Sequence, residues 1–326
     1  MEDASRVGEA RRHAVQLAEE CGFDEVEAGR VALIVTELGT NLLRHARAGR
    51  LLITGRPACG EVDVLAIDEG PGIADIDRSM DDGFSTGTTP GTGLGAVRRL
   101  ATHFDVHSSV PQGTVMVARV RSTKAPVPSR PESGFSFGAI ALPAPGERVC
   151  GDGWAVAVHG SKATLMVADG LGHGPDAAEA SAAALAAFAE DPMAAPRTQI
   201  ERTHQRLRGT RGAAVAVFHA DAGDNTVRSS GAGNVVGRIV SGISDRTLLT
   251  QHGTAGVTIR TPDEASTAWA PHGLLVVCSD GIVTRWGPET LMPVLGRDPL
   301  LAAGILLRDH VRGKDDATVA VLRRKD

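Results

Sequence analysis

A proline-rich segment, residues 122–134, divides this chain into two parts and limits its fold more than any other feature. The segment reads Ser-Thr-Lys-Ala-Pro-Val-Pro-Ser-Arg-Pro-Glu-Ser-Gly. Its three prolines and its lack of apolar periodicity are typical of a linker. The parts on either side, 1–121 and 135–326, each have the length of an ordinary domain. We therefore expect two domains, each with its own hydrophobic core.

The composition argues against several classes of protein. Apolar residues make up 42% of the 326 residues, but no apolar run approaches the ~20 residues needed to cross a bilayer. Residues 1–12 lack the apolar core of a signal peptide, and four cysteines are ordinary for a protein of the reducing cytosol. The net charge of -5 and the aromatic content of 3% argue against nucleic-acid binding. We therefore expect a cytoplasmic protein that binds neither membranes nor nucleic acids.

The first part alternates expected helices and strands. Apolar side chains recur at helical spacing up to about residue 46, and Asp24 can cap the start of that helix. A helix is also expected at 4–21 and another at 94–102, with strands at 50–56, 61–67, 104–109 and 114–121.

In the second part, the expected strands outnumber the expected helices. The strands are placed at 135–142, 153–159, 163–168, 212–219, 225–230, 234–240, 274–278 and 317–323. The helices are placed at 175–189, 196–208 and 298–311. The connections permit antiparallel pairing, so this part is expected to form a two-sheet sandwich with helices outside.

A polar row accompanies the apolar stripe of the helix that Asp24 begins. Glu37, Asn41 and His45 are spaced four residues apart and fall on one side of that helix. An Asn carbonyl can complete the coordination of a nucleotide-bound Mg²⁺, and a Glu one turn earlier can accept a proton from an attacking hydroxyl. Taken alone, this spacing is better explained by the polar flank of an amphipathic helix.

Two glycine-containing motifs follow the polar row. Asp68 ends an expected strand, and the glycines after it, Gly70 and Gly72, permit a turn that approaches a flat ring while the carboxylate accepts a hydrogen bond from an adenine amino group. The second motif opens an expected helix, where backbone N–H groups favour phosphate. It consists of Gly91, Gly93, Leu94 and Gly95.

In this order, the three motifs resemble the GHKL ATPase family, and the resemblance covers nearly all of 1–121. Within that family, residues 37–41, 82–87 and 93–100 are most similar to the anti-sigma-factor serine kinases of the RsbT type. The resemblance implies a Bergerat-type α/β ATP-binding sandwich with a lid at about 74–92. It implies that Asn41 holds Mg²⁺, that Glu37 is the catalytic base and that Asp68 binds adenine. Such kinases phosphorylate Ser or Thr on small STAS-domain partners.

Four acidic positions mark the second part. They are Gly151-Asp152, Asp169-Gly170, Asp280-Gly281 and Asp315-Asp316. Each position lies at the end of an apolar strand or in a turn, so the carboxylates can converge on one cleft. Paired Mg²⁺ or Mn²⁺ ions prefer such oxygen ligands and would activate water to attack a phosphate ester. A single Asp-Gly is usually a turn, and only the ordered set favours this hypothesis.

The acidic positions resemble the metal-dependent PPM-type serine/threonine phosphatases in their sporulation stage II protein E branch, over about 135–326. Residues 145–152 are most similar to the RsbX feedback phosphatases. The resemblance implies a PPM-type β-sandwich flanked by helices and a pair of Mn²⁺ or Mg²⁺ ions. Asp169 would bridge the two metals, the Gly170 carbonyl would bind one, Asp280 and Asp315 would complete one shell and Asp152 the other.

Some roles stay open in the sequence. Asp169 and Asp280 are counted as catalytic residues beside Glu37. His173 is either a donor to the leaving oxygen or a loop-packing residue, and Arg148 is a weak candidate for gripping phosphate. His45 is either part of the ATP pocket or structural.

The combined reading is an α/β two-domain regulator of bacterial partner switching. Its phosphatase would act on a STAS-domain phosphoprotein that resembles RsbS, RsbR or an anti-sigma antagonist, and its first domain would bind ATP and Mg²⁺ and phosphorylate such a partner. The main alternative is a first domain that grips a partner only when ATP is bound and transfers no phosphate. A scaffold with inactive sites fits less well, because no acidic position is missing, and a homodimer is compatible with the sequence.

Overall fold

The computed structural model describes residues 3–80, 93–125, 134–242 and 245–325. They form two compact units, 1–129 and 130–326, and the division falls within the proline-rich segment. Gly91, the motif at 82–87 and part of the expected lid at 74–92 lie outside the described residues.

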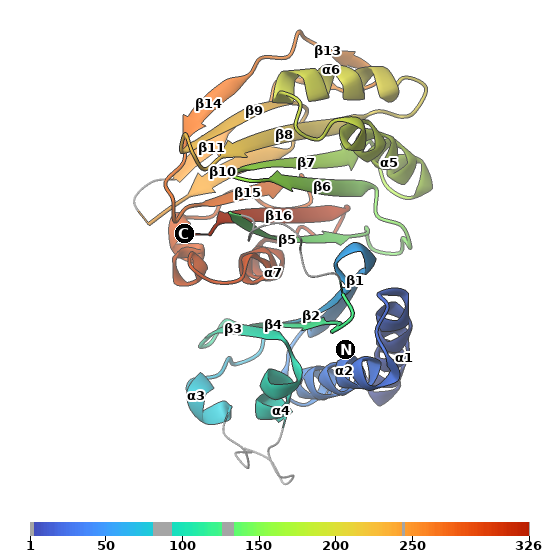
Figure 1. The fold of residues 1–326 in the computed structure, drawn as a ribbon, viewed down its shortest axis with the longest axis vertical. Helices are drawn as coiled ribbons and strands as arrows, with labels where there is room; N and C mark the ends of the chain where they lie inside the picture. The colour runs from blue at the N-terminus through green and yellow to red at the C-terminus, as the bar shows by residue number, and fades with distance from the viewer. Residues whose placement is uncertain (1–2, 81–92, 126–133, 243–244, 326) are drawn as a thin grey trace. The chain divides into compact units, whose positions relative to one another are not determined.

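The first unit is a four-stranded antiparallel sheet with helices on one side (Figure 1). The strand order is β1-β2-β4-β3. The helices are α1 (Ala4–Glu20), α2 (Glu25–His45), α3 (Ile76–Ser79) and α4 (Gly93–Leu100), with a 3-10 turn at Pro57–Cys59. The strands are β1 (Arg50–Arg56), β2 (Glu61–Asp68), β3 (His103–Ser109) and β4 (Gly113–Arg121).

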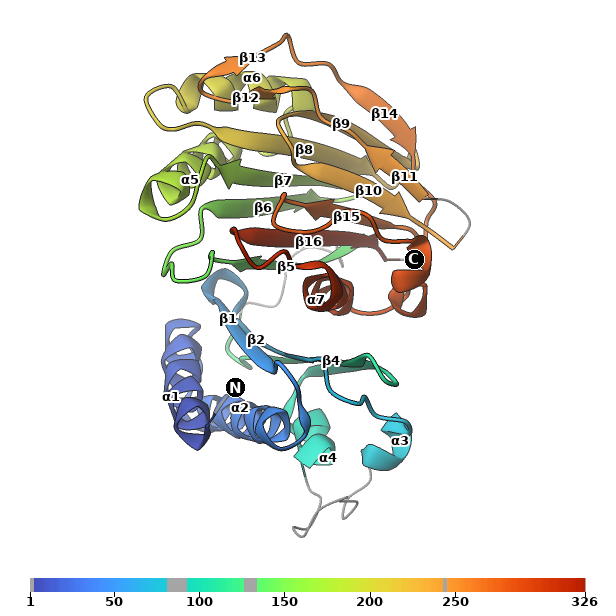
Figure 2. The ribbon, with the colours of Figure 1, turned by 180° about the vertical axis from the view of Figure 1, so that it is seen from behind.

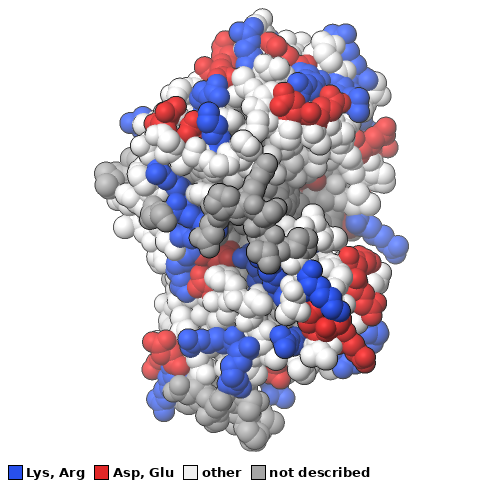
Figure 3. Space-filling model, in the orientation of Figure 1, with Lys and Arg blue, Asp and Glu red and all other residues white. Residues whose placement is uncertain are grey.

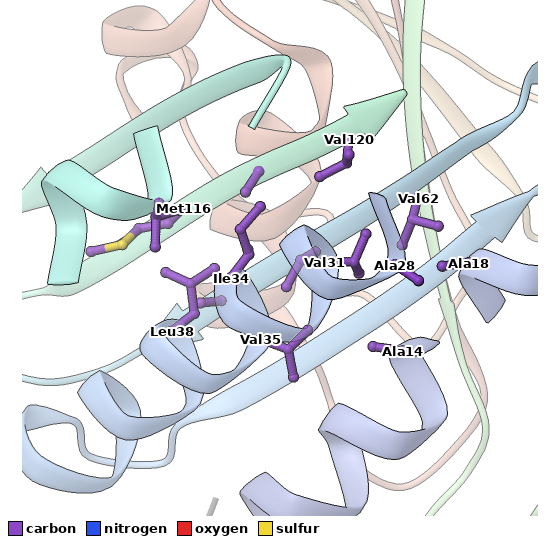
Figure 4. Close-up of a cluster of buried hydrophobic side chains, with 14 of the residues drawn as sticks. Ala14, Ala18, Ala28, Val31, Ile34, Val35, Leu38, Val62, Met116 and Val120 are labelled. Carbon is purple, nitrogen blue, oxygen red and sulfur yellow. The ribbon is translucent and has the colours of Figure 1, made fainter. Parts of the chain in front are cut away.

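Helix α2 contributes both to the core of this unit and to the polar row of Glu37, Asn41 and His45. Its apolar stripe packs on the sheet and on α1, so Glu37 and Asn41 lie beside the core rather than within it. Figure 4 shows the side chains that meet there from α1, α2, β2 and β4. They include Ala14, Ala18, Val31, Ile34, Val35, Leu38, Val62, Met116 and Val120, all buried.

The second unit is a sandwich of two five-stranded antiparallel sheets, seen from both sides in Figures 1 and 2. One sheet has the order β11-β10-β15-β16-β5 and the other β14-β9-β8-β7-β6. The longer strands are β5 (Phe135–Leu142), β6 (Asp152–His159), β7 (Lys162–Gly170), β8 (Ala213–Asp221), β9 (Thr226–Ala232), β10 (Val236–Val240), β15 (Leu274–Cys278) and β16 (Ala317–Arg324). The short strands are β11 (Asp245–Leu248), β12 (Gly253–Thr254), β13 (Thr258–Ile259) and β14 (Ala265–Ala268).

Helices cover the outer faces of this sandwich and pack on the sheets through buried apolar side chains. Helices α5 (Pro175–Glu190) and α6 (Pro196–Arg206) cover the sheet that contains β7, while α7 (Pro299–His310) covers the other. Short 3-10 turns lie at Pro288–Thr290 and Met292–Val294. Between the sheets lie buried side chains from both, among them Phe135, Leu165, Phe218, Ile239, Leu275 and Leu322.

The structure confirms the expected α/β first unit and β-sandwich second unit, and most of the expected elements lie within a few residues of their predicted positions. The short strands between 241 and 273 were missed. They are two to four residues long, which is too short for alternation to show in a sequence. On the face in Figure 3, basic side chains are interspersed with acidic ones. None of the described helices combines the length and hydropathy that crossing a lipid bilayer requires.

The Glu27 carboxylate caps helix α2 and also binds the start of the proline-rich segment. Its Oε2 accepts a hydrogen bond from the Asp24 N–H, which completes a capping box at the start of α2. Its Oε1 accepts hydrogen bonds from the Thr123 N–H at 2.6 Å and the Thr123 hydroxyl at 2.8 Å, while the Ser122 hydroxyl donates to Oε2. The first residues of the proline-rich segment are therefore bound to the first unit.

These hydrogen bonds determine the charge of Glu27, which is only 4% exposed. Burial alone would raise the pKa of this carboxyl group. The hydrogen bonds from Thr123, Asp24 and Ser122 favour the ionised form more strongly and lower the pKa to about 2. The folded pKa thus lies below the ordinary value of 4.5, so the stabilisation is present above pH 4.5 and is lost as the pH falls towards 2.

We expect Glu27→Gln to destabilise the first unit by about 1–3 kcal/mol, because it replaces a charged acceptor that serves several donors. The second unit should be unaffected. The measurement is amide hydrogen exchange of the full chain, comparing protection in α1 and α2 at pH 7. Tryptophan fluorescence follows the second unit separately, because Trp154, Trp269 and Trp286 all lie there.

The matched control is Glu25→Gln, an exposed position in the first turn of the same helix. The difference in stability between wild type and Glu27→Gln should shrink as the pH falls from 5 to about 3. A difference that persists unchanged at pH 3 would contradict the proposed role of the charge.

Candidate functional site

The acidic positions of the second unit meet at one end of the sandwich. Asp152 begins β6, Asp169 lies near the end of β7, and the register of these strands pairs the two residues directly. Asp280 follows β15, and Asp315 precedes β16, the antiparallel neighbour of β15. Strand pairing thus gathers the carboxylates in two pairs, one in each sheet, and the stacking of the sheets brings together the two pairs, which are more than 100 residues apart in sequence.

A serine connects the two sheets at this end. The Ser279 hydroxyl donates a hydrogen bond of 2.6 Å to Asp152 Oδ2 and accepts one of 2.9 Å from the Thr318 N–H. Asp152 belongs to the sheet that contains β7, and Thr318 belongs to the other sheet. Ser279 therefore fixes the orientation of the Asp152 carboxylate, which is only 6% exposed.

Three further carboxylates, those of Asp280, Asp315 and Asp316, accept hydrogen bonds. Asp280 Oδ2 accepts a hydrogen bond of 2.6 Å from the Asn234 amide. Asp316 Oδ1 accepts one of 2.8 Å from the Ala144 N–H, and Asp315 Oδ1 accepts one of 2.9 Å from the Asp316 N–H. Each of these hydrogen bonds engages one of the two oxygens of its carboxylate.

Burial and mutual repulsion make this cluster costly to ionise. Burial raises the pKa of Asp169 to about 8, and the charges of Asp152, Asp280 and Asp315 act in the same direction. Burial also raises the pKa of Asp152, with further contributions from Asp316 and Asp280. The pKa of Asp280 is raised first by burial and then by Asp315, against an opposing effect of Arg312. A cation at this position would relieve the repulsion.

The oxygens of the cluster suit a hard divalent cation, although its ligands are not already assembled. Asp152 Oδ1 and Asp316 Oδ2 are buried and have no hydrogen-bond partner among the residues that the structure describes, which is unfavourable unless a cation or water binds them. All the donors are oxygens, as Mg²⁺ and Mn²⁺ prefer. Within the described residues, however, no three His, Cys, Asp or Glu side chains converge closely enough to hold a metal ion.

Glycines let the loops of this end approach one another. A Cβ atom on Gly281 would lie 1.9 Å from the carbonyl oxygen of Asp316, and one on Gly151 would lie 2.5 Å from Asp316 Oδ2. A Cβ atom on Gly170 would lie 2.1 Å from the carbonyl oxygen of Ala177 in α5. The sequence predicted functional positions at these Asp-Gly pairs, and the structure adds that no side chain fits beside the aspartates.

The two weaker candidates are both at the surface. His173 is exposed, and its Nδ1 lies 2.8 Å from Glu147 Oε1. Arg148 is also exposed. Arg312, which the sequence analysis did not consider, is the arginine whose charge acts on Asp280.

In the first unit, the polar row of α2 faces the start of α4. A Cβ atom on Gly93 would lie 3.0 Å from Glu37 Oε2 and 3.8 Å from the Asn41 amide nitrogen. Glu37, Asn41 and Gly93 are therefore brought together, with Leu94 and Gly95 in the first turn of α4. The absence of a side chain at Gly93 keeps the space before these polar groups open.

The Asp68 turn packs against the end of α2 and the β3–β4 hairpin. Asp68 Oδ1 accepts a hydrogen bond of 2.7 Å from the Gly70 N–H, and a Cβ atom on Gly70 would lie 2.9 Å from the carbonyl oxygen of His45. Gly72 has a φ of +76°, and a Cβ atom there would lie 2.5 Å from the Ser109 carbonyl oxygen. Both glycines are thus required by close backbone contacts, while the His45 side chain is exposed.

The sequence analysis gave no role to Ser279 or Asn234, and it chose Asp315 rather than Asp316 as a metal ligand. Ser279 could have been suspected from its place beside Asp280. Nothing in the sequence near Asn234 points to Asp280, 46 residues away. Asp316 is buried, whereas Asp315 is half-buried and acts on the pKa values of Asp169 and Asp280.

Each unit matches the model of a different protein family. Residues 2–120 match the model of the histidine kinase-like ATPase domain. Residues 159–325 match the model of stage II sporulation protein E (SpoIIE). The serine/threonine-protein kinase RsbT of Bacillus subtilis (strain 168) is 36% identical over 111 residues, which are 33% of this chain and 84% of that protein.

Solved structures resemble the second unit. One, from a study of the bacterial stressosome as a modular system adapted to control secondary messenger signaling, has a TM-score of 0.55 and 27% identity and covers 58% of this chain and 99% of its own. Another, RsbX in complex with magnesium, has a TM-score of 0.54 and 19% identity. The match covers 60% of this chain and 98% of the RsbX chain. At that identity, the second structure supports the fold alone.

We expect the metal-free second unit to lose stability as the pH rises from 4 to 8. The folded pKa of Asp169 lies above the ordinary value of 3.8, so its favourable contribution is complete below pH 3.8 and is lost as the pH rises through about 8. Asp169→Asn should reduce this pH dependence, because it removes the buried charge. The measurement is thermal unfolding in chelator, followed by tryptophan fluorescence at several pH values.

Adding Mn²⁺ should raise the unfolding temperature of wild type most at pH 8, where the carboxylates are least stable without a cation. The same addition should do little for Asp169→Asn. Identical pH profiles for the two proteins in chelator would contradict the assigned environment of Asp169.

Proposed function

Because this chain belongs to the stage II sporulation protein E family through its second unit and to the family of the kinase RsbT through its first, we propose that it controls the phosphorylation of STAS-domain proteins in both directions. The chain joins a SpoIIE-type phosphatase to an RsbT-type ATP-binding domain. The proposed substrates are phosphoserine or phosphothreonine on a protein similar to RsbS, RsbR or an anti-sigma antagonist.

One observation supports the proposal that the acidic cluster is the phosphatase site. Acidic side chains from four segments influence one another's ionisation at one end of the sandwich, and two buried oxygens there find no hydrogen-bond partner in the described part of the chain. A structural role would not require so many like charges in one place, because each raises the cost of the others. Cation binding explains both features.

The residues proposed to hold a pair of Mg²⁺ or Mn²⁺ ions are Asp152, Asp169, Asp280, Asp315 and the Gly170 carbonyl. When bound, such ions lower the pKa of water and neutralise charge on phosphoryl oxygens. Asp316 adds a further carboxylate beside Asp152. Ser279 keeps the Asp152 carboxylate directed into the cluster, and His173, held by Glu147, is the candidate donor to the leaving oxygen.

The first unit offers the groups for phosphate transfer at the end of α4. Glu37 is proposed to accept a proton from the partner's hydroxyl, and Asn41 to hold the Mg²⁺ of the nucleotide. The backbone of Gly91, Gly93, Leu94 and Gly95 would contact phosphates, and Asp68 would bind adenine. The short distance from Glu37 to the Gly93 position supports this arrangement, because the base and the phosphate site must be adjacent.

A second candidate function concerns the first unit alone. In this alternative, ATP binding makes the unit grip a partner, such as an RsbS-like protein or a sigma factor, without transferring phosphate. The presence of both Glu37 and Asn41 beside Gly93 favours transfer. The two functions differ in whether γ-phosphate appears on the partner.

For the phosphatase, we expect Asp169→Asn to reduce Mn²⁺-dependent hydrolysis of a phosphorylated STAS protein by at least about 100-fold, the scale of losing one preorganised charged group. Hydrolysis is measured as release of inorganic phosphate from the full chain with Mn²⁺ or Mg²⁺. His219→Gln, a buried position that faces Thr164, serves as a control outside the cluster. Near-normal turnover of Asp169→Asn would refute the ligand assignment.

For the kinase, we expect Glu37→Ala to abolish transfer of labelled γ-phosphate to a STAS protein while ATP still binds, because the base does not contact adenine. Asp68→Asn should instead weaken ATP binding. Phosphatase-inactive Asp169→Asn is the background for both variants, so that transferred phosphate is not removed. ATP binding by wild type without transfer to any STAS partner would favour the binding switch.

A further inference from the structure

The turn between β9 and β10 places an amide against the acidic cluster. Asn234 Nδ2 donates a hydrogen bond of 2.6 Å to Asp280 Oδ2. Resting on the proposed phosphatase function, we infer that Asn234 is a positioning residue that holds Asp280 in the orientation needed to bind a divalent cation. No other part of the proposed mechanism uses this residue.

The pairing of β10 with β15 explains why Asn234 meets Asp280. In the antiparallel register, Val236 is opposite Cys278. Continuing this register by two residues on each strand brings Asn234 opposite Asp280. The contact therefore follows from the sheet itself and does not depend on a chance meeting of two loops.

The turn that carries Asn234 is firmly held. Gly233 has a φ of +112°, and a Cβ atom there would lie 2.3 Å from the Cβ of Ala214 in β8. The Gly233 N–H donates to the Gln251 carbonyl at 2.8 Å, and the Gly233 carbonyl accepts from the Thr250 hydroxyl at 2.6 Å. Although the Asn234 side chain is exposed, its backbone cannot move far.

The chemistry of this contact suits orientation rather than catalysis. An amide N–H₂ group is a neutral donor, so it satisfies one carboxylate oxygen without competing for a cation and leaves the other oxygen available. Asp280 lies among the like charges of Asp169 and Asp315, which favour its rotation away from the cluster. Partners that hold metal ligands in this way typically change metal affinity by about 10–100-fold when removed.

The competing explanation is that Asn234 only stabilises its turn. A structural role would lower the stability of the metal-free protein and leave the affinity for a cation unchanged. A positioning role would lower the affinity for a cation and leave the stability of the metal-free protein unchanged. Metal affinity and metal-free stability therefore separate the two explanations.

The experiment compares full-length wild type with Asn234→Ala and Asn234→Leu, the second of which nearly preserves volume. Mn²⁺ binding is measured without substrate or nucleotide, from the electron paramagnetic resonance signal of free Mn²⁺. The matched control is Gln251→Ala, which removes an exposed amide–carboxylate contact to Asp263 beside the same turn. Thermal unfolding in chelator is recorded for all four proteins.

We expect both Asn234 variants to bind Mn²⁺ about 10-fold more weakly, the lower end of the usual range, because the contact is partly open to water. Gln251→Ala should bind like wild type, and unfolding in chelator should be the same for wild type and both Asn234 variants. Unchanged affinity, weaker binding by Asn234→Leu alone, or a loss of metal-free stability that accounts for the change would overturn the inference. Wild type that binds no Mn²⁺ would overturn the proposed phosphatase function as well.

Discussion

Repulsion among carboxylates at one end of the β-sandwich is the constraint on which the second unit depends. Strand register forces Asp152 and Asp169 into direct opposition, and the ends of β15 and β16 add Asp280 and Asp315. A protein that never bound cations there would gain stability by replacing one of them, because like charges in a half-buried place raise one another's pKa. The surrounding hydrogen bonds do not remove this repulsion. They orient four of the carboxylates, and a cation at this end of the sandwich would relieve the repulsion.

Much of this organisation could be predicted from local sequence. The Asp24 cap, the stripe of α2 and the strands on either side of each Asp-Gly pair follow from rules that involve only neighbouring residues. The partners of the carboxylates could not be predicted. Asn234 reaches Asp280 through the pairing of β10 with β15, and the Ala144 N–H reaches Asp316 across 172 residues. Such contacts depend on which strands become neighbours. Nearly every residue carries a backbone N–H group, so the sequence does not indicate which of them meets a given carboxylate.

Under the proposed function, the two units bind phosphate by different physical means. In the first, the space before Glu37 and Asn41 is made by the missing side chain of Gly93, and a helix N-terminus provides N–H donors. In the second, negative charge is concentrated until a cation is needed to balance it. One site is thus ready for an anion directly, and the other becomes ready only after a cation has bound. This difference accounts for why sequence motifs describe the first site by glycines and the second by aspartates.

The crowding around Gly281 affects how an inactive relative should be recognised. The Asp316 carbonyl fills the space where a side chain would begin, so even a methyl group would push apart the loops that carry Asp280 and Asp315. A homologue could retain every aspartate and still be a pseudophosphatase because of one alanine at this point. Surveys that score only the acidic residues would count such a protein as an active enzyme.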